Sequence, residues 1–479
     1  MNQDSLKQRT IKGVTWTSID LFVNLGFNFV IGVILARLLS PDNYGLIAMI
    51  AVFNSVANAF LDCGFGNAII RKMHLTEDDT CTAFYFNLCA GIVLYGILWL
   101  LAPFAALFYD EPILSPLLRV ESITLVLSSG YVIQNTLLKR NLKFKSLAFV
   151  NVLSNVLAGA VGIIAAYYGY GVWSLVIMHL SGGILRLFTL WLVSSWRPRG
   201  HWSRKSFNYL WGFGSKLLAS GVINDVYNNI YPIVIGKFFS PAALGQYSRA
   251  DQYAQLPSQS LTKVLQQVTY PVLSQIQDDS IRLSSAYRRM LRVSTFIIFP
   301  VMLGFAALAK PLVVCLVTEK WLECVPYLQI ICFASMLYPV HAINLNLLQV
   351  KGRSDLFLRL EIIKKIIITI SVFCSIPFGI KGMCLGAVIT SVFCLIINTY
   401  YTGKMINVGL CRQLLDLAPS FINSLIMGIV TYTVSNQFDN AYLQLSVGVP
   451  TGIIYYLLST KILHFSELDE LLDIIHKRS

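Results

Sequence analysis

Charged residues are scarce in this sequence. Only 13% of its 479 residues are Asp, Glu, Lys or Arg, whereas 56% are hydrophobic, and the mean hydropathy is +0.64. Such a composition excludes a soluble globular protein, whose surface needs many more charges. The alternation of polar and apolar residues that marks membrane strands is also missing. The sequence therefore predicts an all-α polytopic membrane protein, in which each helix satisfies its own backbone hydrogen bonds.

Long apolar stretches fill most of the chain. A helix that crosses the ~30 Å hydrocarbon core of a bilayer needs about 20 apolar residues. The sequence predicts about fourteen such helices and leaves almost no polar sequence for an aqueous domain. The predicted spans are residues 14–38, 44–68, 82–108, 113–136, 146–168, 171–195, 208–236, 244–274, 290–309, 324–349, 356–377, 380–402, 413–435 and 441–463.

Patterns that carry catalysis are missing as well. No Gly-rich nucleotide loop is present, since Gly64 and Gly66 lack a third glycine. No two histidines have metal-ligand spacing. A membrane-bound polymerase or ligase would need a sizeable outer loop with catalytic Arg, Glu or His, and the longest outer turn, near 310–324, is short. We therefore expect a protein that is not an enzyme and that uses no cofactor and no metal.

The formal net charge of +13 raises the alternative of a nucleic-acid-binding protein. If the N-terminus lies inside, however, Lys and Arg gather in inside loops such as 71–72, 139–145 and 197–205. The outside turns hold only Arg37, Lys237, Lys310, Lys320 and Lys381. This is the positive-inside bias of a multi-spanning protein, so no nucleic-acid partner is expected.

These patterns also predict where the protein resides. The first apolar run is too long for a cleavable signal peptide and lacks a small-residue cleavage site. We expect a multi-pass protein of the inner (plasma) membrane with both termini in the cytoplasm.

One turn occurs twice in the chain. L-L-S-P-D-N-Y-G at 38–45 and F-F-S-P-A-A-L-G at 238–245 each follow a long apolar stretch. Six predicted spans separate the copies, so two parallel halves are related by an axis along the membrane normal. The predicted organisation is an N-lobe at 1–203 with six spans, a C-lobe at 204–404 with six more, and two spans with a cytoplasmic tail at 405–479. Rocking of such lobes exposes the cleft between them to either side.

Polar residues inside spans cost free energy, so their positions indicate where a cleft lies. They recur at helical spacing on the first, second, seventh and eighth predicted helices, which places them on one face of each. They either line a water-filled lumen or join neighbouring helices by hydrogen bonds. Because four equivalent helices carry such stripes, the lumen is favoured. The candidate polar lumen residues are Asn24, Asn28, Asn54, Asn58, Asn224, Asn228, Gln252 and Gln259.

Charged residues also occur within the polar stripes. Three cations on the seventh and eighth helices suit an anionic substrate group such as a phosphate; they are Lys216, Arg249 and Lys263. Each acidic residue of the stripes either forms a structural salt bridge or carries a proton or sodium ion that is coupled to transport. The four acidic candidates are Asp20, Asp62, Asp225 and Asp251.

Five stretches, largely in turns and loops, follow one another between residues 62 and 365, within a resemblance that covers about residues 10–415. They are D-C-G-F-G-N-A-I-I-R-K (62–72), G-K-F-F-S-P-A-A-L-G-Q-Y-S-R-A-D-Q-Y-A-Q-L-P (236–257), Y-P-V-L-S-Q-I-Q-D-D (270–279), E-K-W-L-E-C-V-P-Y-L-Q-I (319–330) and K-G-R-S-D-L-F-L-R-L-E-I-I-K-K (351–365). Their order and spacing resemble bacterial polysaccharide flippases. These form the polysaccharide-transporter branch of the multidrug/oligosaccharidyl-lipid/polysaccharide superfamily. The similarity is greatest to exporters of colanic acid, teichuronic acid or similar exopolysaccharide units.

The resemblance implies a substrate and a mechanism. The substrate is an undecaprenyl-pyrophosphate-linked oligosaccharide, moved from the cytoplasmic to the outer leaflet by alternating access for exopolysaccharide, O-antigen or capsule synthesis. The resemblance also implies a cation-rich lumen for the pyrophosphate, whereas the first two helices carry Asp20 and Asp62 in their stripes. The implied partners are the lipid-linked oligosaccharide, membrane lipids, an H⁺ or Na⁺ counter-ion, and a polysaccharide polymerase or export machinery.

Two other transporter classes remain as alternatives. A cation-coupled multidrug antiporter of the same superfamily would share the two-lobed fold and favour an acidic lumen; the five stretches favour the flippase. A major-facilitator transporter also has parallel six-helix halves. It usually carries a G-x-x-x-D-R-x-G-R-R-like loop after its second helix, where this chain has R-K-M-H-L-T-E-D-D at 71–79.

Overall fold

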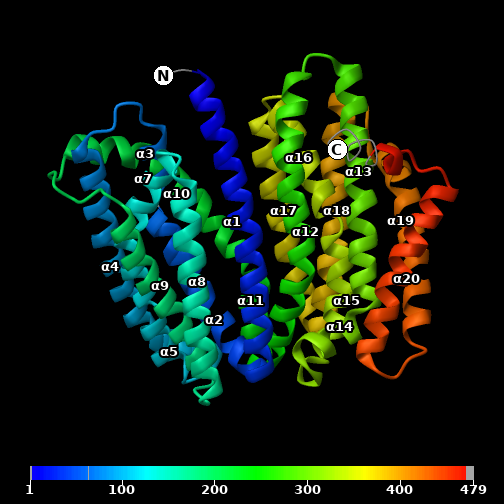
Figure 1. Ribbon diagram of the computed structural model, residues 1–479, viewed down its shortest axis with the longest axis horizontal. Helices are drawn as coiled ribbons and strands as arrows, with labels where there is room; N and C mark the ends of the chain where they lie inside the picture. Colours follow the sequence, from blue (N-terminus) through cyan, green and yellow to red (C-terminus); the bar gives the residue numbers. More distant parts are fainter. Residues whose placement is uncertain (1–2, 63, 471–479) are drawn as a thin grey trace. The chain divides into compact units, whose positions relative to one another are not determined.

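The computed structural model describes residues 3–62 and 64–470, and every regular element in these residues is a helix (Figure 1). The chain forms two compact units, Met1–Gly245 and Gln246–Ser479. The predicted boundary between the N-lobe and the C-lobe, at 203/204, was drawn from the sequence repeat, whereas the two compact units are defined by packing. The lobe boundary therefore stays a prediction.

The first unit contains helices α1 to α11. Helix α8 packs against both α1 and α9, α4 packs against α5 and α6, and α10 packs against α2 and α3. The bounds are α1 Gln3–Leu38, α2 Pro41–Asp62, α3 Phe65–Arg71, α4 Glu77–Tyr109, α5 Leu114–Glu121, α6 Ile123–Ser129, α7 Val132–Arg140, α8 Phe144–Tyr167, α9 Trp173–Val193, α10 Arg204–Asn228 and α11 Ile230–Phe238.

The second unit begins within helix α12. Helix α13 packs most extensively on α19, which also packs on α20, while α18 packs on α15 and α17. The bounds are α12 Pro241–Gln275, α13 Ser280–Ala307, α14 Ala309–Val317, η1 Glu319–Trp321, α15 Cys324–Ser335, α16 Tyr338–Val350, α17 Ser354–Ser375, η2 Ile376–Phe378, α18 Gly379–Ile406, α19 Leu410–Ser435 and α20 Ala441–Ile462.

The protein is an all-helical, multi-pass membrane protein. Each of the fourteen predicted spans falls on one of these helices or on consecutive helices. Within the described residues, 10 helical segments are long and apolar enough to cross a membrane, or up to 11 if the bent pair Leu114–Ser129 and Val132–Arg140 forms one span. The predicted spans at 208–236 and 244–274 correspond to α10–α11 and to α12, and neither is among these 10 segments.

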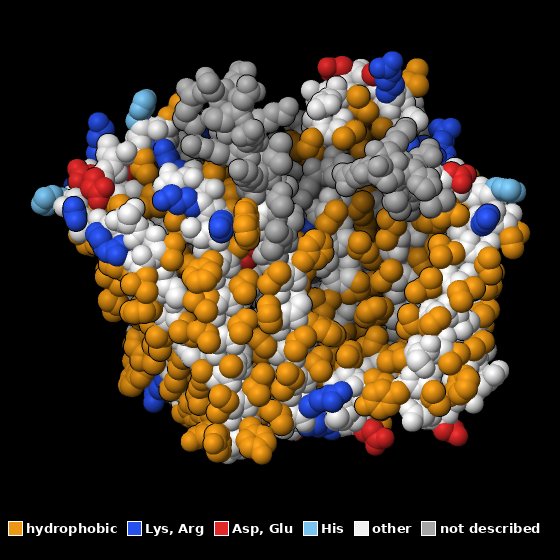
Figure 2. Space-filling view, in the orientation of Figure 1, with side chains coloured by type: hydrophobic (Ala, Val, Ile, Leu, Met, Phe, Trp, Pro, Cys, Tyr) orange, Lys and Arg blue, Asp and Glu red, His pale blue; other side chains and the backbone are white. Residues whose placement is uncertain are grey.

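Apolar side chains cover the outer faces of the helices. On α4, Leu100, Phe104 and Leu107 are 64%, 66% and 72% exposed, and their spacing places them on one side of the helix. Figure 2 shows hydrophobic side chains along the lengths of the helices and Lys, Arg, Asp and Glu gathered near helix ends. An exposed apolar surface of this kind suits the hydrocarbon core of a bilayer.

Both copies of the repeated turn begin a helix. Helix α2 begins at Pro41 and α12 begins at Pro241, and proline is favoured at the first helical position because it lacks an N–H that would have no partner there. The residue that closes each turn is a glycine, Gly45 or Gly245. The repeat found in the sequence therefore corresponds to a repeated helix start.

The two turns contact each other within the first unit. A Cβ atom on Gly45 would lie 1.8 Å from the carbonyl oxygen of Pro241, and one on Gly245 would lie 1.9 Å from the carbonyl oxygen of Pro41. The contact is reciprocal, as a two-fold relation between the copies requires. Glycine is needed at both positions because any side chain would collide with backbone that cannot rotate away.

Candidate functional site

The polar stripe of α1 faces α8. The Asp20 carboxylate accepts hydrogen bonds from Asn24 Nδ2 at 2.5 Å and from Asn151 Nδ2 at 3.1 Å. Asn155 Nδ2 donates to Asn24 Oδ1 at 2.6 Å, whereas Asn28 is exposed. Two of the three stripe residues thus join helices of the same unit. The sequence reasoning missed their partners on α8, although the four-residue spacing of Asn151 and Asn155 within a predicted span was a visible signal.

The stripe of α2 is partly buried. Asn54 is 9% exposed, and its carbonyl oxygen accepts a hydrogen bond from Asn58 Nδ2 at 2.8 Å. Asn58 itself is exposed. Nearby, Ser55 Oγ accepts a hydrogen bond from Asn229 Nδ2 at 3.0 Å. The side chain of Asp62 lies outside the described residues.

The predicted seventh span is interrupted. Helix α10 ends at Asn228 and α11 begins at Ile230. Asn229 lies between them, and its Nδ2 donates to the carbonyl oxygen of Asp225 at 2.8 Å. Asn224 and Asn228 are exposed, and Asp225 is half-buried. The side chain of Lys216 lies outside the described residues.

Helix α12 carries a continuous polar stripe in the second unit. Gln255 Nε2 donates to the Asp251 carboxylate at 2.6 Å, and Gln259 Nε2 donates to Gln255 Oε1 at 2.5 Å. Lys263 follows one turn later on the same face, as its four-residue spacing requires, and its side chain is exposed. The stripe therefore presents a carboxylate, two amides and an ammonium group along one line.

Arg249 has different surroundings from Lys263. It is 3% exposed, and it donates a hydrogen bond to Gln252 Oε1 at 2.9 Å. Its guanidinium lies 5.1 Å from the ring centre of Trp321 and 5.7 Å from that of Tyr253. Trp321 is fully buried in η1. These contacts pack Arg249 against the η1 turn, and the Gln252 side chain that accepts its hydrogen bond is exposed.

A buried polar network joins four helices of the second unit. Tyr287 Oη on α13 donates to Asn344 Oδ1 on α16 at 2.8 Å. Asn344 Nδ2 donates to Gln413 Oε1 on α19 at 3.2 Å. Gln413 Nε2 donates to Thr402 Oγ1 on α18 at 2.9 Å. The sequence reasoning missed this network because its members lie far apart in the chain, and no local spacing connects them.

The structure also buries a cation that was not among the predicted lumen residues. Lys364 on α17 is 8% exposed, and its ammonium lies 3.3 Å from Glu361 Oε1. His341 on the neighbouring α16 accepts or donates hydrogen bonds with Ser391 at 3.0 Å and Asn398 at 3.3 Å. The sequence analysis did not single out Lys364, because its position in the chain does not show which side of its helix is buried. The structure buries it in a helix.

The structure also bears on the expected absence of a metal. Residues 3–62 and 64–470 contain no group of three or more His, Cys, Asp or Glu side chains placed to hold a metal ion. The absence of a metal and a cofactor stays an expectation.

With this geometry in place, the family is decided by a sequence model for "Polysaccharide biosynthesis protein", which matches residues 34–326. The chain belongs to this family. The matched range includes the repeated turn at both positions and the polar helices α2, α10 and α12. The family predicted from the five sequence stretches is therefore confirmed.

Curated relatives match over nearly the whole chain. The lipopolysaccharide biosynthesis protein WzxC of Escherichia coli is 26% identical, over 89% of this chain and 88% of its own length. The teichuronic acid biosynthesis protein TuaB of Bacillus subtilis is also 26% identical, over 95% of each chain. The succinoglycan biosynthesis transport protein ExoT of Rhizobium meliloti is 24% identical, over 98% of this chain and 96% of its own length.

Solved structures share the fold. The lipid II flippase MurJ in an inward closed conformation aligns with a TM-score of 0.77 at 17% identity, over 94% of this chain and 99% of its own. An inward-facing multidrug resistance MATE family transporter of the MOP superfamily aligns with a TM-score of 0.63 at 15% identity, over 82% of this chain and 98% of its own. At these identities the likeness concerns the fold alone. It confirms the predicted fold class.

Proposed function

We propose that this protein moves undecaprenyl-pyrophosphate-linked oligosaccharide repeat units from the cytoplasmic to the outer leaflet of the bacterial inner membrane. The observation that carries the proposal is the family match, which covers most of both predicted lobes. Relatives named for lipopolysaccharide, teichuronic acid and succinoglycan biosynthesis support a saccharide substrate. A fold shared with a lipid II flippase supports transport of a saccharide while it is attached to a lipid carrier.

The pyrophosphate is the group for which the chain offers the clearest contact. Lys263 is the exposed cation at the end of the α12 stripe, and an ammonium binds phosphate as a compact point charge. Gln252, which is exposed, and Gln259, which lies one turn before Lys263 on the stripe, provide amides for sugar hydroxyls. Lys216 is proposed as a second phosphate-binding cation because of its position in α10. Arg249 is proposed to support the site by holding the η1 turn and the start of α12 in place.

Alternating access requires a contact that opens and closes. The reciprocal packing of Gly45 and Gly245 brings the two repeated turns together without intervening side chains. We assign this contact to the outer end of the path, because both turns are predicted to lie outside. Close packing at the outer end would prevent leakage while the substrate enters from the cytoplasm.

The proposal also includes the coupling of transport to a counter-ion. Asp20 accepts two amide hydrogen bonds and Asp251 accepts one, and both carboxylates lie within predicted spans. Asp62 and Asp225 remain candidates on position. Each is proposed to exchange a proton or a sodium ion during the lobe movement, since a carboxylate with amide neighbours offers oxygen ligands to either ion.

Genetic complementation tests the proposed function in cells. In a strain that lacks its own exporter, expression of this chain should restore surface polysaccharide and remove the accumulated lipid-linked repeat units from the inner leaflet. A multidrug antiporter of the same fold would instead lower the cellular content of a cationic dye such as ethidium. Dye efflux without restored polysaccharide would contradict the flippase and favour the antiporter.

A further inference from the structure

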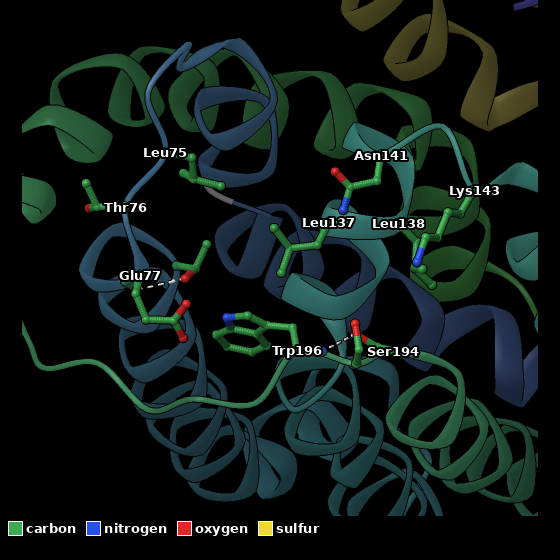
Figure 3. Close-up of a pocket in the computed structure, with 11 residues that line it drawn as sticks. Leu75, Thr76, Glu77, Leu137, Leu138, Asn141, Lys143, Ser194 and Trp196 are labelled. Atoms are coloured by element: carbon green, nitrogen blue, oxygen red, sulfur yellow. Dashed lines mark hydrogen bonds between the residues drawn. The ribbon is translucent and has the colours of Figure 1, made fainter. Parts of the chain in front are cut away.

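A polar cavity of about 190 Å³ lies at one end of the first unit (Figure 3). Three separate segments surround it: the start of α4, the turn between α7 and α8, and the chain that follows α9. Figure 3 shows Thr76 and Glu77 on one side, Asn141 and Lys143 on the other, and Trp196 between them. None of these residues belongs to the polar stripes described above. The positive-inside distribution places this end in the cytoplasm.

Local structure fixes the first wall. The Asp79 side chain accepts a hydrogen bond from the Thr76 backbone N–H at 2.9 Å, and the Asp79 N–H donates to Thr76 Oγ1 at 3.3 Å. This reciprocal cap defines where α4 begins. Lys72 binds the same carboxylate at 2.7 Å. Glu77, one residue after the cap, is therefore held at the rim of the cavity.

Local structure also fixes the other two walls. Leu142 adopts a left-handed backbone with φ 55°, which turns the chain sharply so that Lys143 N–H bonds to Leu138 O at 2.9 Å. Arg197 donates to the carbonyl oxygens of Ser194 at 2.6 Å and Trp196 at 2.8 Å. A non-glycine residue with positive φ is uncommon. The turn at Leu142 and the side-chain hydrogen bonds of Asp79 and Arg197 to backbone atoms thus fix the course of the chain around the cavity.

One hydrogen-bond donor in the cavity has no partner among the described residues. The Nε1 atom of Trp196 is buried, and no acceptor lies within reach of it in that part of the chain. Figure 3 shows this nitrogen turned toward the space between Glu77 and Leu137. Buried indole N–H groups usually find an acceptor. The missing acceptor points to a ligand that supplies one.

The chemistry of the walls selects the class of ligand. Glu77 accepts hydrogen bonds, Lys143 donates them, and the Asn141 amide and Ser194 hydroxyl do both. The two charges sum to zero, and the carboxylate of Glu77 disfavours a phosphate, which carries the same sign of charge. The indole of Trp196 adds an apolar face beside its N–H. Mixed donors and acceptors next to an aromatic ring suit a neutral ring that carries several hydroxyl groups.

We propose that this cavity is a cytoplasmic binding site for a single sugar ring. A volume of about 190 Å³ is below the ~300–1,000 Å³ of drug-sized sites, so it admits one ring and not an oligosaccharide chain. The ring belongs either to a lipid-linked repeat unit that docks before transport or to a free cytoplasmic sugar. The first source rests on the proposed function; sugar binding itself does not.

Saturation-transfer NMR tests the site directly. The probes are D-glucose and D-galactose, added to the purified full-length protein in lipid nanodiscs. We expect transfer to at least one hexose, reduced about fivefold in Trp196→Phe and in Glu77→Gln, because each change removes one hydrogen bond to the ligand. Phe keeps an aromatic ring at the position of Trp196, so the packing against Phe84 is preserved. The control Glu111→Gln, just beyond the other end of α4, should leave the transfer unchanged.

Two results would overturn the proposal. One is hexose transfer that is the same in the wild type and in both variants. The other is binding of inorganic phosphate, detected by broadening of its ³¹P signal, that Lys143→Ala abolishes while hexoses show no transfer. The cavity would then be an anion site.

A flipping assay separates the two sources of the sugar. If the ring belongs to the lipid-linked unit, Trp196→Phe should raise KM for flipping several-fold and leave the maximal rate unchanged. If hexose binding falls in the variant but KM does not change, the ligand is a free sugar. A wild-type protein that binds hexose and does not flip lipid-linked units would contradict the proposed function alone, because the sugar site would remain.

Discussion

Lys263 differs from Arg249, the other predicted lumen cation whose side chain is described, because its side chain is exposed at the end of a hydrogen-bonded stripe. A charge-assisted hydrogen bond contributes about 1.5–3 kcal/mol, and every 1.4 kcal/mol changes an affinity about tenfold. Lys263→Ala should therefore reduce flipping of pyrophosphate-linked oligosaccharide by about 10- to 100-fold, and Lys263→Arg should retain most of it. The measurement is the initial rate in proteoliposomes.

Exposed cations elsewhere provide the control for this prediction. Lys139 lies at the end of α7 and is exposed, so Lys139→Ala should flip at the wild-type rate. An equal loss in Lys139→Ala and Lys263→Ala would show that general surface charge, and not a contact in the path, sets the rate.

Gly45 allows two backbones to meet where no side chain fits. In Gly45→Ala the added Cβ would overlap the carbonyl oxygen of Pro241, which lies 1.8 Å from the Cβ position. Overpacking of this kind costs about 1–3 kcal/mol, so the variant should unfold at a lower temperature in detergent and transport more slowly. Gly96→Ala on α4 is the control, since a Cβ there has nothing within 4 Å. A Gly45→Ala protein with wild-type stability and rate would show that this close contact is not needed.

The predictable part of the site consists of features that repeat locally. The S-P-x-x-x-G turn was found from its two copies, and the polar face of α12 was found from the many amide and charged residues within that predicted span. What the stripes contact was not predictable. The spacing of Asp20 and Asn24 fits a lumen and a helix interface equally well, and the decision depends on Asn151 and Asn155, which are distant in sequence.

Arg249 and Lys364 show the same limit in charged residues. A sequence gives the position of a cation along a helix but not the side of the helix that is buried. The contact of Arg249 with Trp321 and the burial of Lys364 both arise from packing between helices.

At the scale of helices, an ion pair fixes the ends of α13 and α19. Arg288 Nε and Nη2 each donate to the Asp416 carboxylate at 2.7 Å. The Asp416 side chain is only 5% exposed, whereas that of Arg288 is 33% exposed. Two further pairs, Arg289–Glu470 at 2.8 Å and Arg292–Glu467 at 3.3 Å, join α13 to the segment after α20. These pairs hold α19 and the segment after α20 against α13.

Removing one partner of the Arg288–Asp416 pair should destabilise the protein more than removing both partners. Arg288→Ala leaves the buried Asp416 carboxylate without its partner, and uncompensated buried charge is destabilising by about 3–5 kcal/mol at full burial, so about 2 kcal/mol is expected at this partly exposed pair. The double variant Arg288→Ala/Asp416→Leu should recover much of that loss. Thermal unfolding in detergent measures both. A double variant less stable than Arg288→Ala would contradict this account.

At the scale of the whole molecule, the distribution of Lys and Arg predicts the orientation in the membrane. Reporter fusions in the loops at 71–72 and 197–205 should have cytoplasmic activity, and a tag at Asp42 should be accessible from outside. The turn that carries Asp42 contacts the second copy of the repeat through Gly45. The tag is therefore placed at Asp42, whose side chain is exposed. A 197–205 loop accessible from outside would reverse the orientation and place the proposed sugar site on the wrong side.

The central claim is transport of a lipid-linked saccharide, and reconstitution tests it most directly. Purified protein is placed in liposomes that carry a fluorescent undecaprenyl-pyrophosphate-linked oligosaccharide, and an impermeant sugar-oxidising or lectin reagent then reports how much reaches the opposite leaflet. The account predicts that wild-type protein exposes this substrate within minutes, that Lys263→Ala slows it by about 10-fold or more, and that Lys139→Ala does not. Liposomes in which wild-type protein moves no more substrate than protein-free liposomes, while the same preparation drives exchange of a cationic drug, would contradict it.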